Sequence, residues 1–248
     1  MLNKIINFSL VLSLLAFMLV SCGKDDDNNS NGPVNGSSAA VFNPDITYGT
    51  MKDADGNTYK TVTIGTQTWM AENLRTTKYN DGSPIPNVTD RDEWEYLSTG
   101  AYCNYDNSND AAIIRTFGRL YNWHALNTGK IAPNGWRVPT DDDWDILIDY
   151  LGGPDIAGGK LKEAGTKHWR TPNTGADNET GFTALPGGQR EGNGNFEVFG
   201  FDGYWWSITE SGTARAWRRH LLYDMNSIRR NGTSKLSGQS VRLIKDNG

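Results

Sequence analysis

Cysteine is nearly absent from this chain, which holds only Cys22 and Cys103 in 248 residues. So few cysteines exclude a disulfide-rich scaffold and a zinc site built from paired cysteines. Cys103 lies in the segment GAYCNY, which is typical of a buried strand. We therefore expect its thiol to act as a small apolar side chain rather than as a nucleophile.

Basic residues are also scarce, since 24 Lys and Arg stand against 29 Asp and Glu and the formal net charge is −5. Proteins that bind nucleic acids usually present a basic patch or stripe to the phosphates. The nearest candidates here, Trp217–His220 and Arg229–Arg230, are short and separate. We expect no nucleic-acid partner.

Familiar catalytic motifs are missing: there is no His-Glu-x-x-His, Gly-x-Ser-x-Gly or phosphate-binding loop. His124, His168 and His220 are far apart in the sequence, and each is expected to be packed or at the surface rather than a metal ligand. We predict no metal, no cofactor and no catalytic residue. A hydrolytic pair of carboxylates, such as Glu72 with Glu210, stays open as an alternative because their geometry is invisible in a sequence.

The one long apolar run, Ile5–Val20, follows the positive start at Lys4 and is shorter than the roughly 20 residues that a membrane-spanning helix needs. A positive start before a short apolar stretch indicates a secretory signal. The run ends at Leu-Val-Ser-Cys, which resembles the bacterial lipobox. We predict a signal peptide over residues 1–21, lipidation of Cys22 and a lipid anchor in the bacterial outer membrane.

Residues 22–45 are rich in Asp, Asn, Ser and Gly, a composition that predicts a flexible linker. The run Lys24–Asp27 resembles the acidic export signals of surface lipoproteins of the Bacteroidetes. Residues 46–248 show no further break in composition and are of single-domain size. We therefore predict one exported domain that is exposed at the cell surface.

Nine tryptophans and 28 glycines favour many short turns and a large aromatic core over long helices. We predict an α+β fold that is rich in loops, with short, twisted antiparallel strands and about two to three helices. One helix is expected to start at Thr89 and another at Thr140.

The segment GWRVPTDDDWDIL places four acids within residues 141–145, which suggests a metal or catalytic cluster. A helix start explains them equally well. Thr140 can cap the first turn, Asp143 can complete a capping box, and the other acids favour the positive end of the helix dipole. We predict that these acids start a helix and that Arg137 pairs with one of them.

A second acidic spacing, Asp53, Asp55 and Asn57, is like the start of a calcium loop. An EF-hand loop needs glycine at its sixth position and glutamate at its twelfth. Thr58 and Ile64 occupy those positions here. The spacing therefore predicts a hairpin turn and no bound calcium.

Several blocks follow one another in an order typical of one family: DADGNTYKTVTIGTQTWMAENL, GRLYNWHAL, GWRVPTDDDW, NETGFTALPGGQR, GYWWSITE and SVRLI. They resemble the Fibrobacter succinogenes major paralogous (FISUMP) domain, which is common on exported bacterial lipoproteins. The GWRVPTDDDW block is also similar to formylglycine-generating-enzyme-like domains, which implies a C-type-lectin-like fold. Many family members carry cysteine where this chain has Ala132 and Leu243. The oxidase cysteines and the calcium-dependent sugar-binding motifs of those distant relatives are absent.

These features favour a surface-tethered module that binds a glycan or a cell-surface protein. A hydrolytic enzyme and a structural subunit of a surface assembly are the alternatives. Trp205 and Trp206 point to opposite faces of one strand, so at least one of them is expected in the core. The remaining surface candidates for ligand contact are Tyr204, Trp206, Arg218 and His220.

Overall fold

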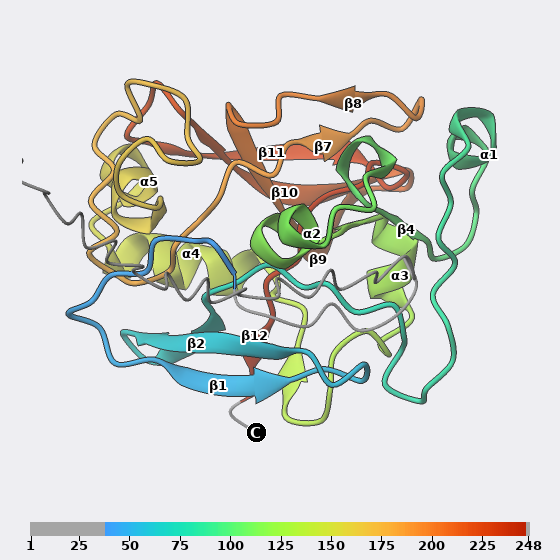
Figure 1. Ribbon diagram of the computed structural model, residues 1–248, viewed down its shortest axis with the longest axis horizontal. Helices are drawn as coiled ribbons and strands as arrows, with labels where there is room; N and C mark the ends of the chain where they lie inside the picture. Colours follow the sequence, from blue (N-terminus) through green and yellow to red (C-terminus); the bar gives the residue numbers. More distant parts are fainter. Residues whose placement is uncertain (1–37, 247–248) are drawn as a thin grey trace, which may run out of the picture.

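The computed structural model describes residues 38–246, which fold as a mixture of short helices and curled antiparallel sheets (Figure 1). Cys22, the predicted signal peptide and most of the predicted linker lie outside these residues. Within them, no helix has the length and apolar character required to span a membrane.

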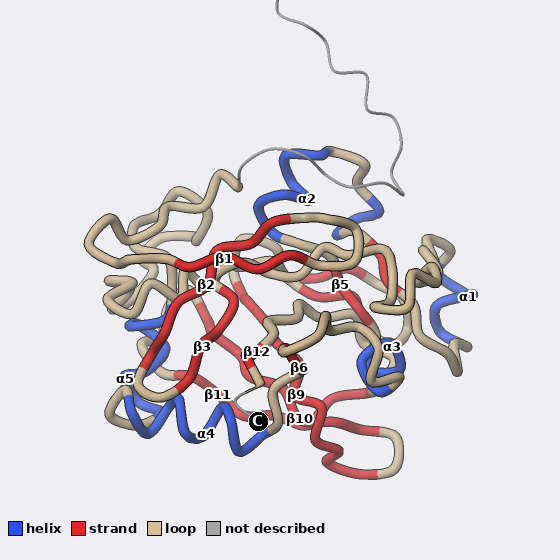
Figure 2. Tube along the Cα trace, turned by 90° about the horizontal axis from the view of Figure 1, so that it is seen from below, coloured by secondary structure: helices blue, strands red, loops and turns tan. Residues whose placement is uncertain are grey.

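The larger sheet has five strands in the order β1-β2-β3-β12-β6, and every pairing in it is antiparallel. Its members are β1 (Gly49–Lys52), β2 (Thr58–Ile64), β3 (Gln67–Met70), β12 (Ile244–Lys245) and β6 (Trp136–Arg137). Figure 2 shows these strands from below, with the C-terminal strand β12 among them. The end of the domain is thus hydrogen-bonded between segments that occur far earlier in the chain.

A second antiparallel sheet has the order β11-β10-β9 and is built from long hairpins. Its strands are β9 (Asp202–Gly212), β10 (Arg215–Leu222) and β11 (Ile228–Ser234). Two small ribbons complete the strands: β4 (Tyr102–Cys103) with β5 (Leu120–Tyr121), and β7 (Gln189–Arg190) with β8 (Phe196–Glu197). In Figure 1 the second sheet and the β7–β8 ribbon lie at the opposite side of the molecule from β1 and β2.

Five α-helices lie in the described part of the chain, more than the two to three predicted. They are α1 (Arg91–Glu95), α2 (Ala111–Phe117), α3 (Trp123–Asn127), α4 (Asp141–Tyr150) and α5 (Pro154–Leu161), and a 3₁₀ turn, η1, spans Tyr105–Asn107. The first three have only five to seven residues, too few for an apolar stripe to repeat in the sequence. The first helix also starts one residue late, because Asp90 rather than Thr89 accepts the capping hydrogen bond, from the backbone N–H of Glu93.

The start of α4 confirms the helix-cap interpretation of the acidic segment. The Thr140 hydroxyl accepts from the Asp143 N–H at 3.1 Å, and the Asp143 carboxylate accepts from the Thr140 N–H at 2.7 Å. Arg137 forms a bidentate ion pair with Asp143, as predicted. Asp141 accepts hydrogen bonds from Arg219 and Arg230 of the second sheet. Asp145 also accepts from Arg219, so three of the four acids attach the helix to its neighbours, while Asp142 is exposed.

The core joins both sheets through α4 and α5. One cluster combines Trp69 of β3, Trp144 of α4, Leu161 of α5 and Trp205 of β9. Cys103 is fully buried in a smaller cluster, as expected, and burial raises the pKa of its thiol to about 12. Four arginines are also fully buried: Arg119, Arg190, Arg219 and Arg242. All four donate to main-chain carbonyl oxygens, which ties separate loops to the core.

Residues 38–45 contact the domain, although their composition predicts a flexible linker. The Val41 N–H donates to the buried Glu163 carboxylate at 2.6 Å, and the Asn43 amide donates to the Asn178 carbonyl at 3.0 Å. Phe42 packs against the core cluster and stacks edge-on against Tyr48. The two hydrogen bonds join residues more than 100 positions apart, so composition alone does not reveal them.

Candidate functional site

The structure brings together three of the four predicted ligand residues. The Tyr204 and His220 rings stack with their centroids 4.2 Å apart, and the Arg218 guanidinium lies 4.2 Å from the Tyr204 centroid. Asp202 accepts hydrogen bonds from the Tyr204 hydroxyl at 3.0 Å and from His220 Nε2 at 3.2 Å. The cross-strand pairing of β9 with β10 positions this stack.

The predicted surface exposure of these residues is nevertheless wrong for three of the four. Trp206 has no exposed surface, and its indole N–H donates to the Tyr121 carbonyl inside the second core cluster. Tyr204 and His220 are also buried, at 5% and 9% exposure, and burial lowers the pKa of His220. Only Arg218 is half-exposed, and it donates to Gln189 of β7. Strand alternation predicts two faces, but it does not tell whether another element covers one of them.

The acidic positions that the sequence highlighted also have protein partners. Asp53 accepts from the backbone N–H groups of Asp55 and Asn57, as in a tight turn, which fits the predicted hairpin. Within residues 38–246, no three His, Cys, Asp or Glu side chains cluster as metal ligands would. Glu210 on β9 pairs with Lys235, whereas Glu72 lies in a pocket beside the other sheet. The suggested pair of carboxylates therefore does not share a pocket.

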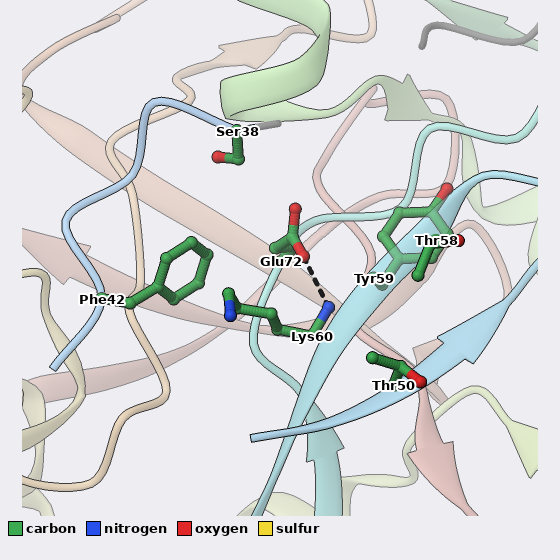
Figure 3. Close-up of a pocket in the computed structure, with 7 residues that line it drawn as sticks. All are labelled: Ser38, Phe42, Thr50, Thr58, Tyr59, Lys60 and Glu72. Atoms are coloured by element: carbon green, nitrogen blue, oxygen red, sulfur yellow. Dashed lines mark hydrogen bonds between the residues drawn. The ribbon is translucent and has the colours of Figure 1, made fainter. Parts of the chain in front are cut away.

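The pocket beside Glu72 has a volume of about 430 Å³ and lies between the first two strands and the segment that precedes them. We call it the Lys60 pocket (Figure 3). Four parts of the chain line it, with these residues: Ser38, Phe42, Thr50, Thr58, Tyr59, Lys60 and Glu72. Thr58 and Lys60 share one face of β2, and Thr50 of β1 pairs directly with Lys60. Strand register therefore places two hydroxyl groups beside one ammonium group.

Lys60 extends toward Phe42, as Figure 3 shows. Its Nζ lies 5.1 Å from the centroid of the Phe42 ring and 5.0 Å from that of Tyr48. Both distances are within the range of cation–π attraction. Lys60 is half-buried and makes no ion pair with any described residue. Its ammonium is thus placed by aromatic rings rather than by a carboxylate.

Glu72 supplies the single carboxylate of the pocket and is 8% exposed. One of its oxygens, Oε2, accepts from the Lys60 backbone N–H at 2.5 Å. The other, Oε1, lies 3.6 Å from Nη1 of the buried Arg75. This main-chain hydrogen bond holds the carboxylate of Glu72, which follows β3, against β2, the strand that presents the Lys60 ammonium.

Arg75 lies behind this wall and is 3% exposed. Its Nη2 donates to the Thr58 carbonyl at 2.9 Å, and its guanidinium lies 4.3 Å from the Tyr59 ring centroid. Its Nε and Nη1 are buried and make no hydrogen bond. The pocket thus combines an aromatic ring, hydroxyl groups, one carboxylate and nearby cationic groups.

Sequence reasoning missed most of this site. It singled out Glu72, but paired it with Glu210, and it placed Phe42 and Ser38 in the linker. One local signal could have indicated the site: Thr58 and Lys60 alternate with the buried Tyr59 on one strand, so they share its outer face. The approach of residues 38–42 depends on tertiary contacts that have no local pattern.

The model of the Fibrobacter succinogenes major domain matches residues 62–245, which is more than half of the chain. Neither the curated proteins nor the solved structures provide a match to this chain. Glu72 and Arg75 lie within the matched range, whereas Phe42, Thr50 and Lys60 precede it. The length of the match shows that this chain belongs to the Fibrobacter succinogenes major domain family.

Proposed function

We propose that this protein is a binding module, not an enzyme, and that the Lys60 pocket holds a glycan. The observation that carries the proposal is the pocket's composition. The Phe42 and Tyr59 rings, three Ser and Thr hydroxyl groups, Lys60 and Glu72 line a space of about 430 Å³. Ligand sites typically combine an apolar surface with a few polar groups that fix orientation. A sugar ring presents an apolar face and a rim of hydroxyl groups, so it matches both kinds of lining.

The proposal also includes the cellular location of the protein. A signal peptide over residues 1–21 and lipidation of Cys22 would anchor the chain in the outer membrane, with the domain exposed at the cell surface. Membership of a family common on exported lipoproteins supports this location. We further propose that the α+β domain has a C-type-lectin-like fold. The similarity of GWRVPTDDDW to formylglycine-generating-enzyme-like domains supports that assignment.

Glycan-array binding by the purified full-length chain in detergent tests the function. We expect binding to at least one glycan, and we expect Phe42→Ala to reduce its affinity about tenfold by removing the stacking surface. The matched control is Phe201→Ala, which removes an exposed phenylalanine far along the sequence that does not line the pocket. If no glycan binds, or if both variants bind like the parent chain, this function is wrong. Capture of a surface protein with no glycan binding would support the protein-recognition alternative instead.

The anchor has a separate test in the native host. Cys22→Ser should release the protein from membranes or leave its signal peptide uncleaved. Unchanged membrane attachment with normal processing would contradict lipidation at this position.

A further inference from the structure

We propose that the ligand of the Lys60 pocket is an acidic glycan, with a sugar carboxylate that pairs with the Lys60 ammonium. The inference rests on the proposed function and names the chemical class of its ligand. The juxtaposition that carries it is an unpaired lysine, an aromatic ring and a buried arginine with unused donors around one pocket.

Charged groups of both signs lie at the wall of the pocket or behind it, and Lys60 is the cation that lines it. Lys60 lines the pocket, and Arg75 lies behind its wall beside Glu72. Arg242 donates to Asn73 and to the Met70 carbonyl, on either side of Glu72 in the sequence. Glu72 is the only acid among the residues that line the pocket. Two further carboxylates contact the lining segments from behind: Asp53 accepts from the Tyr59 hydroxyl, and Glu163 accepts from the Val41 N–H. The preference for an anion therefore rests on the Lys60 ammonium, which lines the pocket and makes no ion pair with any described residue.

Glu72 does not neutralise Lys60. Its Oε2 is occupied by the Lys60 backbone N–H, and its Oε1 faces Arg75 Nη1 at 3.6 Å. That distance is too long for a hydrogen bond, and the Nε and Nη1 donors of Arg75 have no acceptor. Asp53, on the other side of Tyr59, is occupied by hydrogen bonds from Asn57 and Tyr59. The Lys60 ammonium thus remains available for an anion from outside the protein.

The burial of nearby arginines strengthens the preference of the pocket for an anionic ligand. Arg75 and Arg242 are 3% and 1% exposed, so solvent screens their charges less than it screens charges at the surface. An anion beside Lys60 would contact the ammonium directly and would experience the Arg75 charge through the pocket wall, against the one lining carboxylate of Glu72. A neutral sugar could stack on Phe42 and bond with the hydroxyl groups, but it would leave the ammonium without a counter-charge.

The test compares oligogalacturonate with its fully methyl-esterified form, because esterification removes the negative charge and keeps the sugar rings. Binding to the full-length chain in detergent is measured by calorimetry at an ionic strength of about 0.01 M and again at about 0.15 M. We expect the charged form to bind at least about tenfold more tightly at low salt, with a smaller difference at high salt. Oligosaccharides that carry sulfate in place of carboxylate form a third arm.

Variants of Lys60 separate charge from packing. Lys60→Met should abolish the difference between the charged and esterified probes, and Lys60→Arg should keep most of it. The control Lys52→Met removes an exposed lysine of β1 that does not line the pocket, and it should leave the difference unchanged. Thermal unfolding of each variant verifies that it is folded.

The outcomes distinguish this inference from the proposed function. Equal affinity for charged and esterified probes, with both weakened by Phe42→Ala, would overturn the acidic class and leave glycan binding intact. Tight binding of the sulfated oligosaccharides alone would overturn the carboxylate and assign a sulfate in its place. If no probe binds in calorimetry and no glycan on the array binds, both the glycan-binding function and the acidic class of ligand are wrong.

Discussion

At the scale of single residues, the ammonium group of Lys162 shows how this domain accommodates buried charge. Lys162 has no exposed surface, and its Nζ donates to the carbonyl oxygens of Thr174, Leu222 and Met225 at 2.9, 3.1 and 2.8 Å. It also lies 5.5 Å from the Trp169 ring centroid. One side chain therefore connects the end of α5 with the segment at Thr174 and with the end of β10 and the turn that follows it.

Replacing Lys162 with methionine should be strongly destabilising. Methionine fills a similar volume but donates nothing, so three carbonyl groups would lose a buried partner. We expect the free energy of unfolding in urea to fall by about 2–4 kcal/mol. Lys52→Met is the control at an exposed site, where a change within about 0.5 kcal/mol is expected. Equal stability of both variants would show that the three hydrogen bonds contribute little.

At the scale of elements, the first turn of α4 was predictable because its signal is local. Thr140 and Asp143 are three residues apart, and their reciprocal hydrogen bonds need nothing beyond the helix itself. The partners of Asp141 were not predictable. Arg219 and Arg230 come from β10 and β11, and only the packing of the second sheet on the helix brings them there. The predicted helix cap was confirmed, whereas the ion pairs between the helix start and the second sheet became visible only in the structure.

The stability of this helix start should depend on pH. Burial raises the pKa of Asp141, but hydrogen bonds from Arg230 and Arg219 outweigh it, so the net pKa lies below its usual value of 3.8. The Asp143 pKa is lowered in the same way, with Arg137 and Thr140 as the bonding partners. A carboxyl whose pKa is lower in the folded state stabilises the protein above its unfolded pKa and loses that contribution as the pH falls.

We therefore expect the free energy of unfolding to decrease as the pH falls below about 4. Urea titrations at several pH values between about 2 and about 6 measure this slope. Asp141→Asn should lower stability at neutral pH and reduce the slope. Asp142→Asn is the matched control, because Asp142 is an exposed residue in the same turn. If the slope were the same in both variants, the coupling to Arg219 and Arg230 would not explain the acid sensitivity.

At the scale of the whole molecule, the end of the domain is held by packing without a covalent link. The C-terminal strand β12 has two residues, and Leu243 just before it is fully buried in the second core cluster. Ala132 packs against that same cluster. The family resemblance implies cysteine at these two positions in many relatives, and their place in one cluster is consistent with that expectation.

Restoring that pair should create a disulfide. We expect Ala132→Cys with Leu243→Cys to lose two hydrogen atoms on oxidation, as measured by mass spectrometry of the intact protein. The oxidised variant should be more stable than its reduced form by about 2–4 kcal/mol. Cys103 is buried in another cluster, so it should not compete. The single variant Leu243→Cys is the control, and it should be destabilised by the lost packing alone. Failure of the double variant to oxidise would show that the two side chains point apart.

Several features of this protein were determined by its sequence alone, because the forces behind them act within a few residues. They include the turn at Asp53, the cap at Thr140, the mixed class of the fold and the apolar role of Cys103. Tertiary structure alone decided which strand faces are covered, and it buried Tyr204 and His220 beneath their neighbours. It also formed the Lys60 pocket, where Phe42, Thr50, Lys60 and Glu72 meet. Such a site depends on contacts between parts of the chain that share no local pattern, so only folding brings its charges and rings together.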